Sequence, residues 1–309
     1  MTRHRKRAPP DRRSQQASES GLPPLGVLEE FSRASLAQWR NAGRNLHQYS
    51  QSLFFDLEKH RAAHSDELVA AIRTSPTGSA TFKSWARVVD WRYSTQPLST
   101  EGSVNADGGR FNIGRQLNAA IYTAFPALYL AEDFPTAYRE RYGIDRETKT
   151  NGLTADELAL IRERSFSKVT VDVLLESYID VGDLNALKFC VEVLRRFEMP
   201  ISVVSLARAL RLKSPGLVRS PAGLQRQLLN PNWRVEPVQY GVPSNPQIFG
   251  RLCEAAGVHG ILYPSVRDGT TRCLALFPQN WKDSTSRVKL VGPVPPEVSV
   301  SRLGGEAGT

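Results

Sequence analysis

The spacing of apolar residues changes near position 75, and this change most constrains how the 309-residue chain can fold. From Leu25 to about Arg73, apolar residues recur at three- and four-residue steps, which is typical of amphipathic helices. Gly43 is expected to divide this stretch into two helices, and Ser75–Ser79, with a Pro and a Gly, to end it at a domain boundary. The apolar stripe either packs on the rest of the protein, the simpler interpretation, or binds a helix of a partner.

Beyond the boundary, strand and helix patterns are mixed. Val169–Leu175 is β-branched and alternating, and a turn-forming segment between Gly260–Tyr263 and Cys273–Phe277 predicts a β-hairpin. The other expected elements are strands at Ala127–Ala131 and, last in the chain, Val288–Val291, and helices at Pro135–Tyr142, Asp183–Phe197, Ile201–Leu212 and Gln247–Ala256. This mixture predicts an α+β fold.

Composition excludes several classes of protein. Hydrophobic residues make up 40% of the chain, too many for a mostly disordered protein, and no run of about 20 apolar residues could span a membrane. Three widely spaced cysteines without a Cys-x-x-Cys pair indicate neither a disulfide framework nor a zinc site. The basic start lacks the apolar core of a secretory signal. We therefore expect a cytoplasmic protein that does not contact membranes.

Part of the net charge of +9 is concentrated near the N-terminus. Residues 1–24 hold six basic and two acidic side chains and are rich in Ser, Gln and Pro, so they predict a disordered tail. Such a tail is either simply solvated, the interpretation we favour, or an arm for nucleic acid. The rest of the chain carries only about +5. Nucleic acid is therefore not the expected partner.

Common catalytic motifs are missing. The chain has no Gly-x-x-x-x-Gly-Lys-Ser/Thr phosphate loop, no Gly-x-Gly-x-x-Gly, no His-Glu-x-x-His and no Gly-x-Ser-x-Gly. His259 is the one histidine beyond the boundary and is expected to be structural or exposed. A catalytic triad or a histidine-based metal site is therefore not expected, and no residue is assigned to a metal.

Three local patterns stand out instead. They are Trp-Arg-Tyr at 91–93; Gly-Gly-Arg-Phe-Asn at 108–112, followed by Ala-Leu-Tyr-Leu-Ala at 127–131 and Tyr-Arg-Glu at 138–140; and Gly-Val-His-Gly-Ile-Leu-Tyr-Pro-Ser-Val-Arg at 257–267. Each one alone has an ordinary structural explanation, such as a turn serine or a core tyrosine. In this order and spacing they form a specific combination.

Together these patterns resemble the RES domain family, over about Trp85 to Val291. The Arg, Glu and Ser that give the family its name fall at Arg92, Glu140 and Ser265. The resemblance implies a mixed β core like that of ADP-ribosyltransferase toxins. It also implies a toxin that consumes NAD as substrate by hydrolysis, or by phosphorolysis when inorganic phosphate is the acceptor, and that needs no cofactor. The implied partner is an Xre-like helix-turn-helix antitoxin.

The chemistry of NAD cleavage fits these residue types. Nicotinamide leaves as a neutral molecule and needs no general acid, whereas the oxocarbenium-like transition state needs a carboxylate, for which Glu140 is the candidate. Arg92, with Arg110 in support, would bind the pyrophosphate because a guanidinium binds phosphate oxygens in bidentate fashion. With Tyr129 and Ser265, Arg92 and Glu140 form the predicted catalytic set.

The remaining predicted ligand contacts are flat rings, hydroxyls and open backbone. Tyr93 and Tyr129 offer rings for nicotinamide and hydroxyls for the ribose, and Gly109 lets the backbone approach the ligand. Ser265 is expected to hydrogen-bond the nicotinamide or ribose and not to act as a nucleophile. Of the neighbouring residues, Asn112 is expected to shape its loop, Arg267 to form a structural ion pair, and Glu132 and Asp133 to cap the following helix.

The chain is longer than compact members of the family. The predicted organisation is a disordered basic tail at 1–24, a helical extension at 25–80, a RES domain at 81–296 with a helical insertion at about 183–230, and a flexible C-terminal tail at 297–309. The insertion is basic, and four roles are open for it. It forms a lid, an antitoxin-binding surface, a site for a protein or nucleic-acid acceptor, or simply a solvated helical face. The leading hypothesis is NAD depletion; the alternatives are a mono-ADP-ribosyltransferase for a protein or nucleic-acid acceptor and an inactive binding module. A homo-oligomer is a further possible assembly of this chain.

Overall fold

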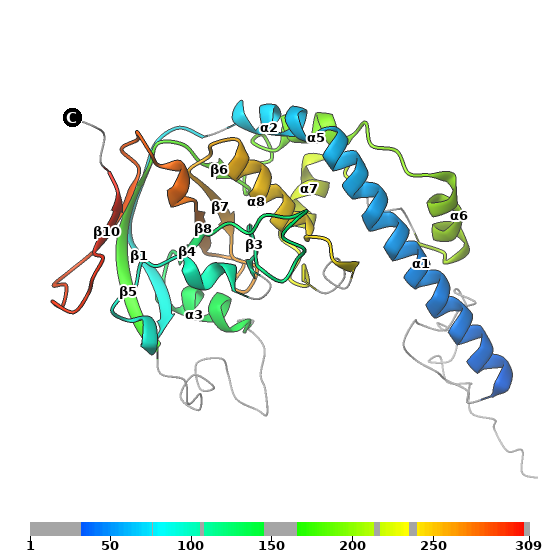
Figure 1. The fold of residues 1–309 in the computed structure, drawn as a ribbon, viewed down its shortest axis with the longest axis horizontal. Helices are drawn as coiled ribbons and strands as arrows, with labels where there is room; N and C mark the ends of the chain where they lie inside the picture. The colour runs from blue at the N-terminus through cyan, green and yellow to red at the C-terminus, as the bar shows by residue number, and fades with distance from the viewer. Residues whose placement is uncertain are drawn as a thin grey trace, which may run out of the picture. The chain divides into compact units, whose positions relative to one another are not determined.

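The computed structural model describes residues 32–75, 77–105, 108–144, 166–212, 217–234 and 240–305 (Figure 1). The chain forms two compact units: Met1–Ser52 with Pro200–Pro215, and Leu53–Met199 with Gly216–Thr309. The predicted basic tail at 1–24 lies outside the described residues, and the domain boundaries expected from the sequence stay predictions.

The second unit is built on an eight-stranded sheet with the order β10-β9-β5-β1-β4-β8-β7-β6. The strands are β1 (Ala80–Asp90), β4 (Leu128–Ala131), β5 (Phe166–Leu175), β6 (Ile179–Asp180), β7 (Gly260–Pro264), β8 (Arg272–Leu276), β9 (Arg287–Leu290) and β10 (Arg302–Gly304). The β6–β7 pair is parallel and the other neighbours are antiparallel, so the sheet is mixed. A separate small hairpin joins β2 (Gly108–Gly109) to β3 (Asn112–Ile113).

The described helices are α1 (Arg33–Ala63), α2 (Ser65–Arg73), α3 (Phe134–Tyr142), α5 (Lys188–Leu194), α6 (Ile201–Ala209), α7 (Pro221–Leu228) and α8 (Asn245–Ala255), with short 3-10 turns η2 (Trp91–Tyr93), η3 (Glu101–Val104) and η5 (Pro278–Asn280). The fold is therefore α+β, as predicted. None of the helices in the described ranges is both long and apolar enough to cross a membrane.

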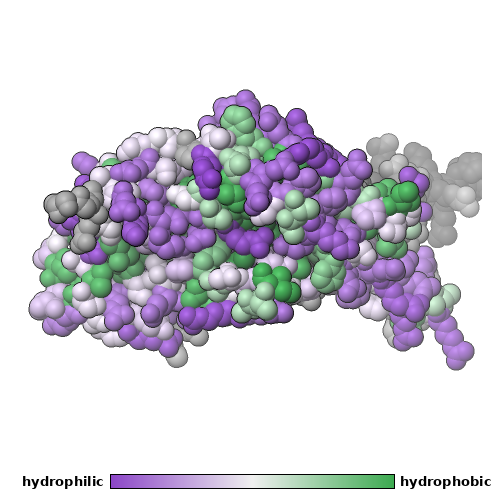
Figure 2. Space-filling model, turned by 45° about the horizontal axis from the view of Figure 1, so that its top comes forward, coloured by the Kyte–Doolittle hydropathy of each residue, from purple (hydrophilic) through white to green (hydrophobic). Residues whose placement is uncertain are grey.

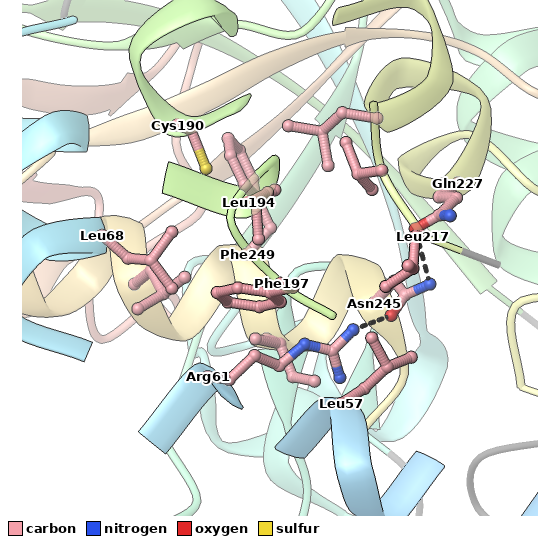
Figure 3. A pocket seen from close by; sticks show the side chains of 14 residues that line it. Leu57, Arg61, Leu68, Cys190, Leu194, Phe197, Leu217, Gln227, Asn245 and Phe249 are labelled. Atoms are coloured by element: carbon pink, nitrogen blue, oxygen red, sulfur yellow. Dashed lines mark hydrogen bonds between the residues drawn. The ribbon is translucent and has the colours of Figure 1, made fainter. Parts of the chain in front are cut away.

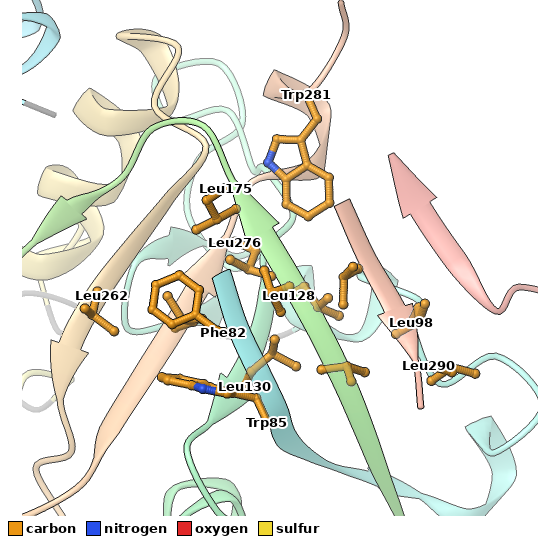
Figure 4. Close-up of a cluster of buried hydrophobic side chains, with 14 residues drawn as sticks. Phe82, Trp85, Leu98, Leu128, Leu130, Leu175, Leu262, Leu276, Trp281 and Leu290 are labelled. Carbon is orange, nitrogen blue, oxygen red and sulfur yellow. The ribbon is translucent and has the colours of Figure 1, made fainter. Parts of the chain in front are cut away.

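The main core lies on one face of the sheet (Figure 4). Alternate residues of β1, β4, β5, β8 and β9 point to this face, because side chains of a strand alternate between the two faces. The cluster is Phe82, Trp85, Leu98, Leu128, Leu130, Val171, Val173, Leu175, Leu262, Leu274, Leu276, Trp281, Val288 and Leu290. Full burial of each such side chain stabilises the fold by about 1.5–3 kcal/mol. Tyr129, one position out of step with Leu128 and Leu130, consequently lies on the opposite face, which α3 and α8 cover.

Three expectations about the elements were wrong. Gly43 lies inside α1, and the break comes at His64, because one exposed glycine costs a long helix only about 1 kcal/mol. Val288–Val291 is not the last strand, because β10 follows it. β10 lies within the segment expected to be a flexible tail and pairs with β9. Of the helix expected at Asp183–Phe197, only α5 forms, because the residues from Asp183 to the start of α5 form turns.

The surface shown in Figure 2 is mostly hydrophilic, with apolar residues in small scattered groups. The three cysteines, Cys190, Cys253 and Cys273, are buried free thiols. Burial raises the pKa of the Cys190 thiol to about 12, so it stays protonated at neutral pH. These thiols therefore act as small core side chains.

Candidate active site

Glu140 and Ser265 are hydrogen-bonded to each other in the folded chain. Glu140 lies in the last turns of α3, and Ser265 directly follows β7. The Ser265 hydroxyl donates to Glu140 Oε1 at 2.7 Å, and the backbone N–H of Val266 donates to the same oxygen at 3.1 Å. Ser265 Oγ in turn accepts the N–H groups of Arg267 and Asp268 at 3.2 and 3.1 Å. The hydroxyl is thereby aimed at the carboxylate and not at open space.

Further contacts fix α3 against the turn that joins β7 to β8. Arg139, beside Glu140, forms an ion pair with Asp268 at 2.8 Å, and both side chains are largely buried. Thr136 Oγ1 lies 2.8 Å from Thr271 Oγ1. Together with the Ser265–Glu140 bond, these contacts attach two successive turns of α3 to one loop. The position of the Glu140 carboxylate is therefore set by the fold.

The start of α3 is fixed by a helix cap. Asp133 precedes the helix and accepts the N–H of Thr136 at 2.8 Å, as expected for a capping carboxylate. Glu132 was expected to cap as well, but it pairs with Arg272 of β8 at 3.0 Å. Its carboxylate is thus bound to Arg272 on the strand that pairs with β4, and not to the start of the helix.

Asn112 organises the glycine-rich loop, which is the segment Gly108–Asn112. Its side chain is fully buried and its Oδ1 accepts the Gly109 N–H and the Tyr129 hydroxyl, each at 2.8 Å. Its Nδ2 donates to the Ser103 and Phe125 carbonyl oxygens at 2.8 and 3.0 Å. The expected loop-shaping role of Asn112 is confirmed.

Tyr129 packs directly on the glycine-rich loop. A Cβ atom at Gly109 would lie 2.4 Å from the Tyr129 hydroxyl oxygen and 2.5 Å from its ring, so only glycine fits there. The hydroxyl also accepts the Phe111 N–H at 2.9 Å. Burial raises the pKa of Tyr129, so the hydroxyl stays protonated. The close approach made possible by Gly109 is therefore to Tyr129, while contact of either residue with a ligand stays a prediction.

Arg92 occupies a different environment. Its side chain is 73% exposed in η2, and its Nη2 lies 4.0 Å from Asp90 Oδ2. Its guanidinium lies 5.3 Å from the ring centre of Tyr93, which is itself exposed. Asp90 Oδ2 also binds Arg141 at 3.1 Å, next to Glu140 in α3. One carboxylate thus connects the exposed Arg92 to the helix that carries Glu140.

Comparison with known proteins identifies the family. The model of the RES domain matches residues 84–297. This chain belongs to the RES domain family. Among solved structures, the crystal structure of the M. tuberculosis MbcT–MbcA toxin–antitoxin complex is similar with a TM-score of 0.41 and 17% identity, over 74% of this chain and 91% of that chain. A search of curated proteins finds no match.

Arg110 of the glycine-rich loop is held by backbone carbonyl groups, and its contact with a ligand stays a prediction. It is buried, and its Nη1 donates to the Leu228 and Asn230 carbonyl oxygens at 3.0 and 2.9 Å. Burial lowers the pKa of Arg110, while Glu140 and Tyr129 lie within electrostatic reach and act in the opposite direction. Its two hydrogen bonds connect the glycine-rich loop to the end of α7 and the chain after it. The spacing of residues within a local motif could not indicate such a long-range contact.

One cavity, lined mainly by residues of α1, α2, α5, α7 and α8, is separate from these residues (Figure 3). It has a volume of about 40 Å³ and is mostly apolar, with Arg61, Asn245 and Gln227 at one side. Arg61 Nη2 donates to Asn245 Oδ1, and Asn245 Nδ2 donates to Gln227 Oε1 at 2.9 Å. This volume holds a few water molecules at most, so the cavity cannot take a dinucleotide.

Proposed function

We propose that this RES domain cleaves the nicotinamide–ribose bond of NAD and passes the ADP-ribosyl group to water or inorganic phosphate. The observation that carries the proposal is the Glu140 carboxylate, whose Oε1 is held by Ser265 and Val266. Within the described residues, both donors to Glu140 bind Oε1, and none contacts its other oxygen, Oε2. That oxygen is available to a ribose hydroxyl or to developing positive charge.

The reaction requires little proton transfer. When the C1′–N bond breaks, its electron pair moves to the nicotinamide nitrogen and the base leaves neutral, while positive charge develops on the ribose. A carboxylate held in place before the reaction stabilises that charge without reorganising. Water or phosphate then bonds to C1′ and releases a proton to solvent. This scheme calls for neither a metal nor a histidine.

The other predicted residues would bind the substrate. Arg92 is exposed and free to turn toward a pyrophosphate, and its weak 4.0 Å contact with Asp90 costs little to exchange. Tyr93, beside it, offers an exposed ring to the nicotinamide or adenine base. Arg110 and Tyr129 would support the site electrostatically and by packing. Ser265 would act through Glu140 by holding its carboxylate.

In the cell, this activity would make the protein a toxin that depletes NAD in the cytoplasm. Its partner would be an Xre-type helix-turn-helix antitoxin, as the family resemblance implies. Expression of the chain alone should lower cellular NAD and stop growth, and co-expression of a helix-turn-helix protein encoded beside it should restore both. Growth arrest with normal NAD would contradict the toxin proposal.

The decisive assay follows nicotinamide release from NAD by the purified chain, with and without phosphate. Glu140→Ala should slow release about a hundredfold to a thousandfold, the usual effect of removing a preorganised electrostatic group. Glu132→Ala is the matched control, because it removes a neighbouring carboxylate that pairs with Arg272. Absence of turnover by the folded wild type would overturn the proposal. Radiolabelled ADP-ribose found on a protein or nucleic acid would instead establish a mono-ADP-ribosyltransferase.

A further inference from the structure

The chain that follows α7 contacts the glycine-rich loop of the candidate site. Arg110 of the loop donates to the carbonyl oxygens of Leu228 and Asn230, and Arg234 Nη2 donates to the Gly108 carbonyl oxygen at 3.1 Å. These contacts join residues more than 100 positions apart and lie within one compact unit. The segment Leu228–Arg234 therefore borders the site. It begins inside the end of the predicted insertion and continues beyond it.

The Trp233 ring contacts both guanidinium groups of this border. The ring is 8% exposed, and the Cζ atoms of Arg110 and Arg234 lie 5.8 and 4.6 Å from its centre. A cation above an indole ring is stabilised electrostatically, and the planar guanidinium is held in one orientation. Trp233 therefore positions Arg234 before any ligand arrives.

Arg234 has binding capacity that the fold does not use. Arg110 is buried and committed to two carbonyls, whereas Arg234 is exposed. A guanidinium has five N–H groups, and the Gly108 carbonyl takes one of those of Arg234. No carboxylate within the described ranges forms an ion pair with Arg234. An oriented, exposed guanidinium that has no ion pair among the described residues is suited to bind an oxyanion with its remaining donors.

Arg234 lies beside the glycine-rich loop and within electrostatic reach of Tyr129. Gly108 precedes Gly109, which packs on the Tyr129 ring. The Arg234 charge is close enough to Tyr129 to lower its pKa, although burial outweighs this effect. Arg110, which also contacts the Trp233 ring, lies within electrostatic reach of Glu140. The guanidinium of Arg234 thus lies at the edge of the candidate site formed by the glycine-rich loop.

We propose that Arg234 binds phosphate oxygens of a ligand in this site, as a second cationic contact besides Arg92. The inference rests on the proposed function and assigns a binding role to the segment after α7. The phosphate oxygens belong either to the pyrophosphate of the dinucleotide or to inorganic phosphate that accepts the ADP-ribosyl group. Both have the same chemistry, and binding measurements with each one distinguish them.

The test measures binding of ADP-ribose and of inorganic phosphate to the full chain by calorimetry. Arg234→Ala should weaken binding of one or both about tenfold, and Arg234→Lys should weaken it less because it keeps the charge. Arg234→Gln is the critical variant: it can still donate to the Gly108 carbonyl but carries no charge. We expect it to bind as weakly as Arg234→Ala. Arg226→Ala removes an exposed arginine of α7 and should bind like wild type.

The source of the phosphate follows from which ligand is affected. Weaker binding of ADP-ribose assigns Arg234 to the dinucleotide, and weaker binding of inorganic phosphate alone assigns it to the acceptor. Wild-type binding of both ligands by folded Arg234→Gln would overturn the inference, since Arg234 would then only hold the loop. NAD turnover is measured in the same samples. A wild type that neither cleaves NAD nor binds ADP-ribose would overturn the proposed function as well.

Discussion

The Glu140 and Arg92 sides of the candidate site are built in opposite ways. Glu140 is held by hydrogen bonds of 2.7 and 3.1 Å, on a helix that a buried ion pair fixes to the next loop. Arg92 is 73% exposed and has one ionic contact, at 4.0 Å. Charge stabilisation during a reaction requires a group that is already in place, whereas ligand binding tolerates a side chain that adjusts. The contrast fits a site with a rigid reacting side and an adaptable binding side.

Removing the buried ion pair on the rigid side should have the largest effect. Arg139→Met leaves Asp268 charged and buried, which should lower the free energy of unfolding by about 3 kcal/mol. It should also lower kcat at least roughly tenfold, because α3 loses a contact that positions Glu140. Chemical denaturation and steady-state kinetics of NAD cleavage measure the two effects.

Two further variants separate stability from positioning. Adding Asp268→Asn to Arg139→Met removes the charge that has lost its ion pair with Arg139, so stability should recover while kcat stays low. Arg141→Met, on the adjacent residue, removes a half-exposed pair with Asp90 and should change stability by less than about 1 kcal/mol. If Arg139→Met left kcat unchanged, the ion pair would have no part in positioning Glu140.

Ser265→Ala should have an intermediate effect. It removes one of the two donors to Glu140 Oε1 and leaves the N–H groups of Arg267 and Asp268 without their acceptor. We expect kcat to fall roughly tenfold, with a loss of about 1–3 kcal/mol in stability. Ser286→Ala is the matched control, because this buried serine accepts the Glu176 N–H and contacts His259, and it forms no hydrogen bond with Glu140 or Ser265.

The two variants should therefore differ in kinetics more than in stability. Thermal unfolding should show similar losses for both, and only Ser265→Ala should reduce kcat. An equal reduction of kcat by both would mean that general destabilisation, and not the Glu140 contact, limits the activity.

Local sequence patterns predicted one part of this site better than another. The order of the motifs singled out Glu140 and Ser265, which the sheet then brings together: β4 leads into α3, and β4 pairs with β8, the strand after the Ser265 turn. The fold class and the hairpin followed from periodicity because these depend on neighbouring residues. The same patterns gave no sign of β1, whose bulge between Phe82 and Trp85 interrupts the alternation.

Contacts between distant segments could not be predicted in this way. Arg110 was expected to support phosphate binding, but its guanidinium donates to Leu228 and Asn230, which follow it by more than 100 positions. The direction of the Ser265 hydroxyl toward Glu140 also depends on how α3 packs against the β7–β8 turn. Local spacing singled out Glu140 and Ser265, which the fold brings together, while the contacts of the other predicted residues depend on tertiary packing.

On the adaptable side, Arg92→Ala should mainly weaken substrate binding. Because the side chain is exposed and its one ionic contact is long, stability should change by less than about 0.5 kcal/mol. Loss of a charge-assisted contact to phosphate should raise KM for NAD roughly tenfold, with a smaller change in kcat. Arg92→Lys should recover part of the loss, since it keeps the charge without the bidentate geometry. Arg115→Ala, at another exposed arginine, should leave KM unchanged.

The Arg92 result bears directly on the comparison between the two sides. A rise in KM with little change in kcat means that Arg92 binds substrate and transition state about equally, as expected of an exposed side chain that moves to its ligand. A fall in kcat as large as that of Ser265→Ala would mean that Arg92 becomes fixed in the transition state. The site would then have two rigid sides, one assembled by folding and the other only when NAD binds.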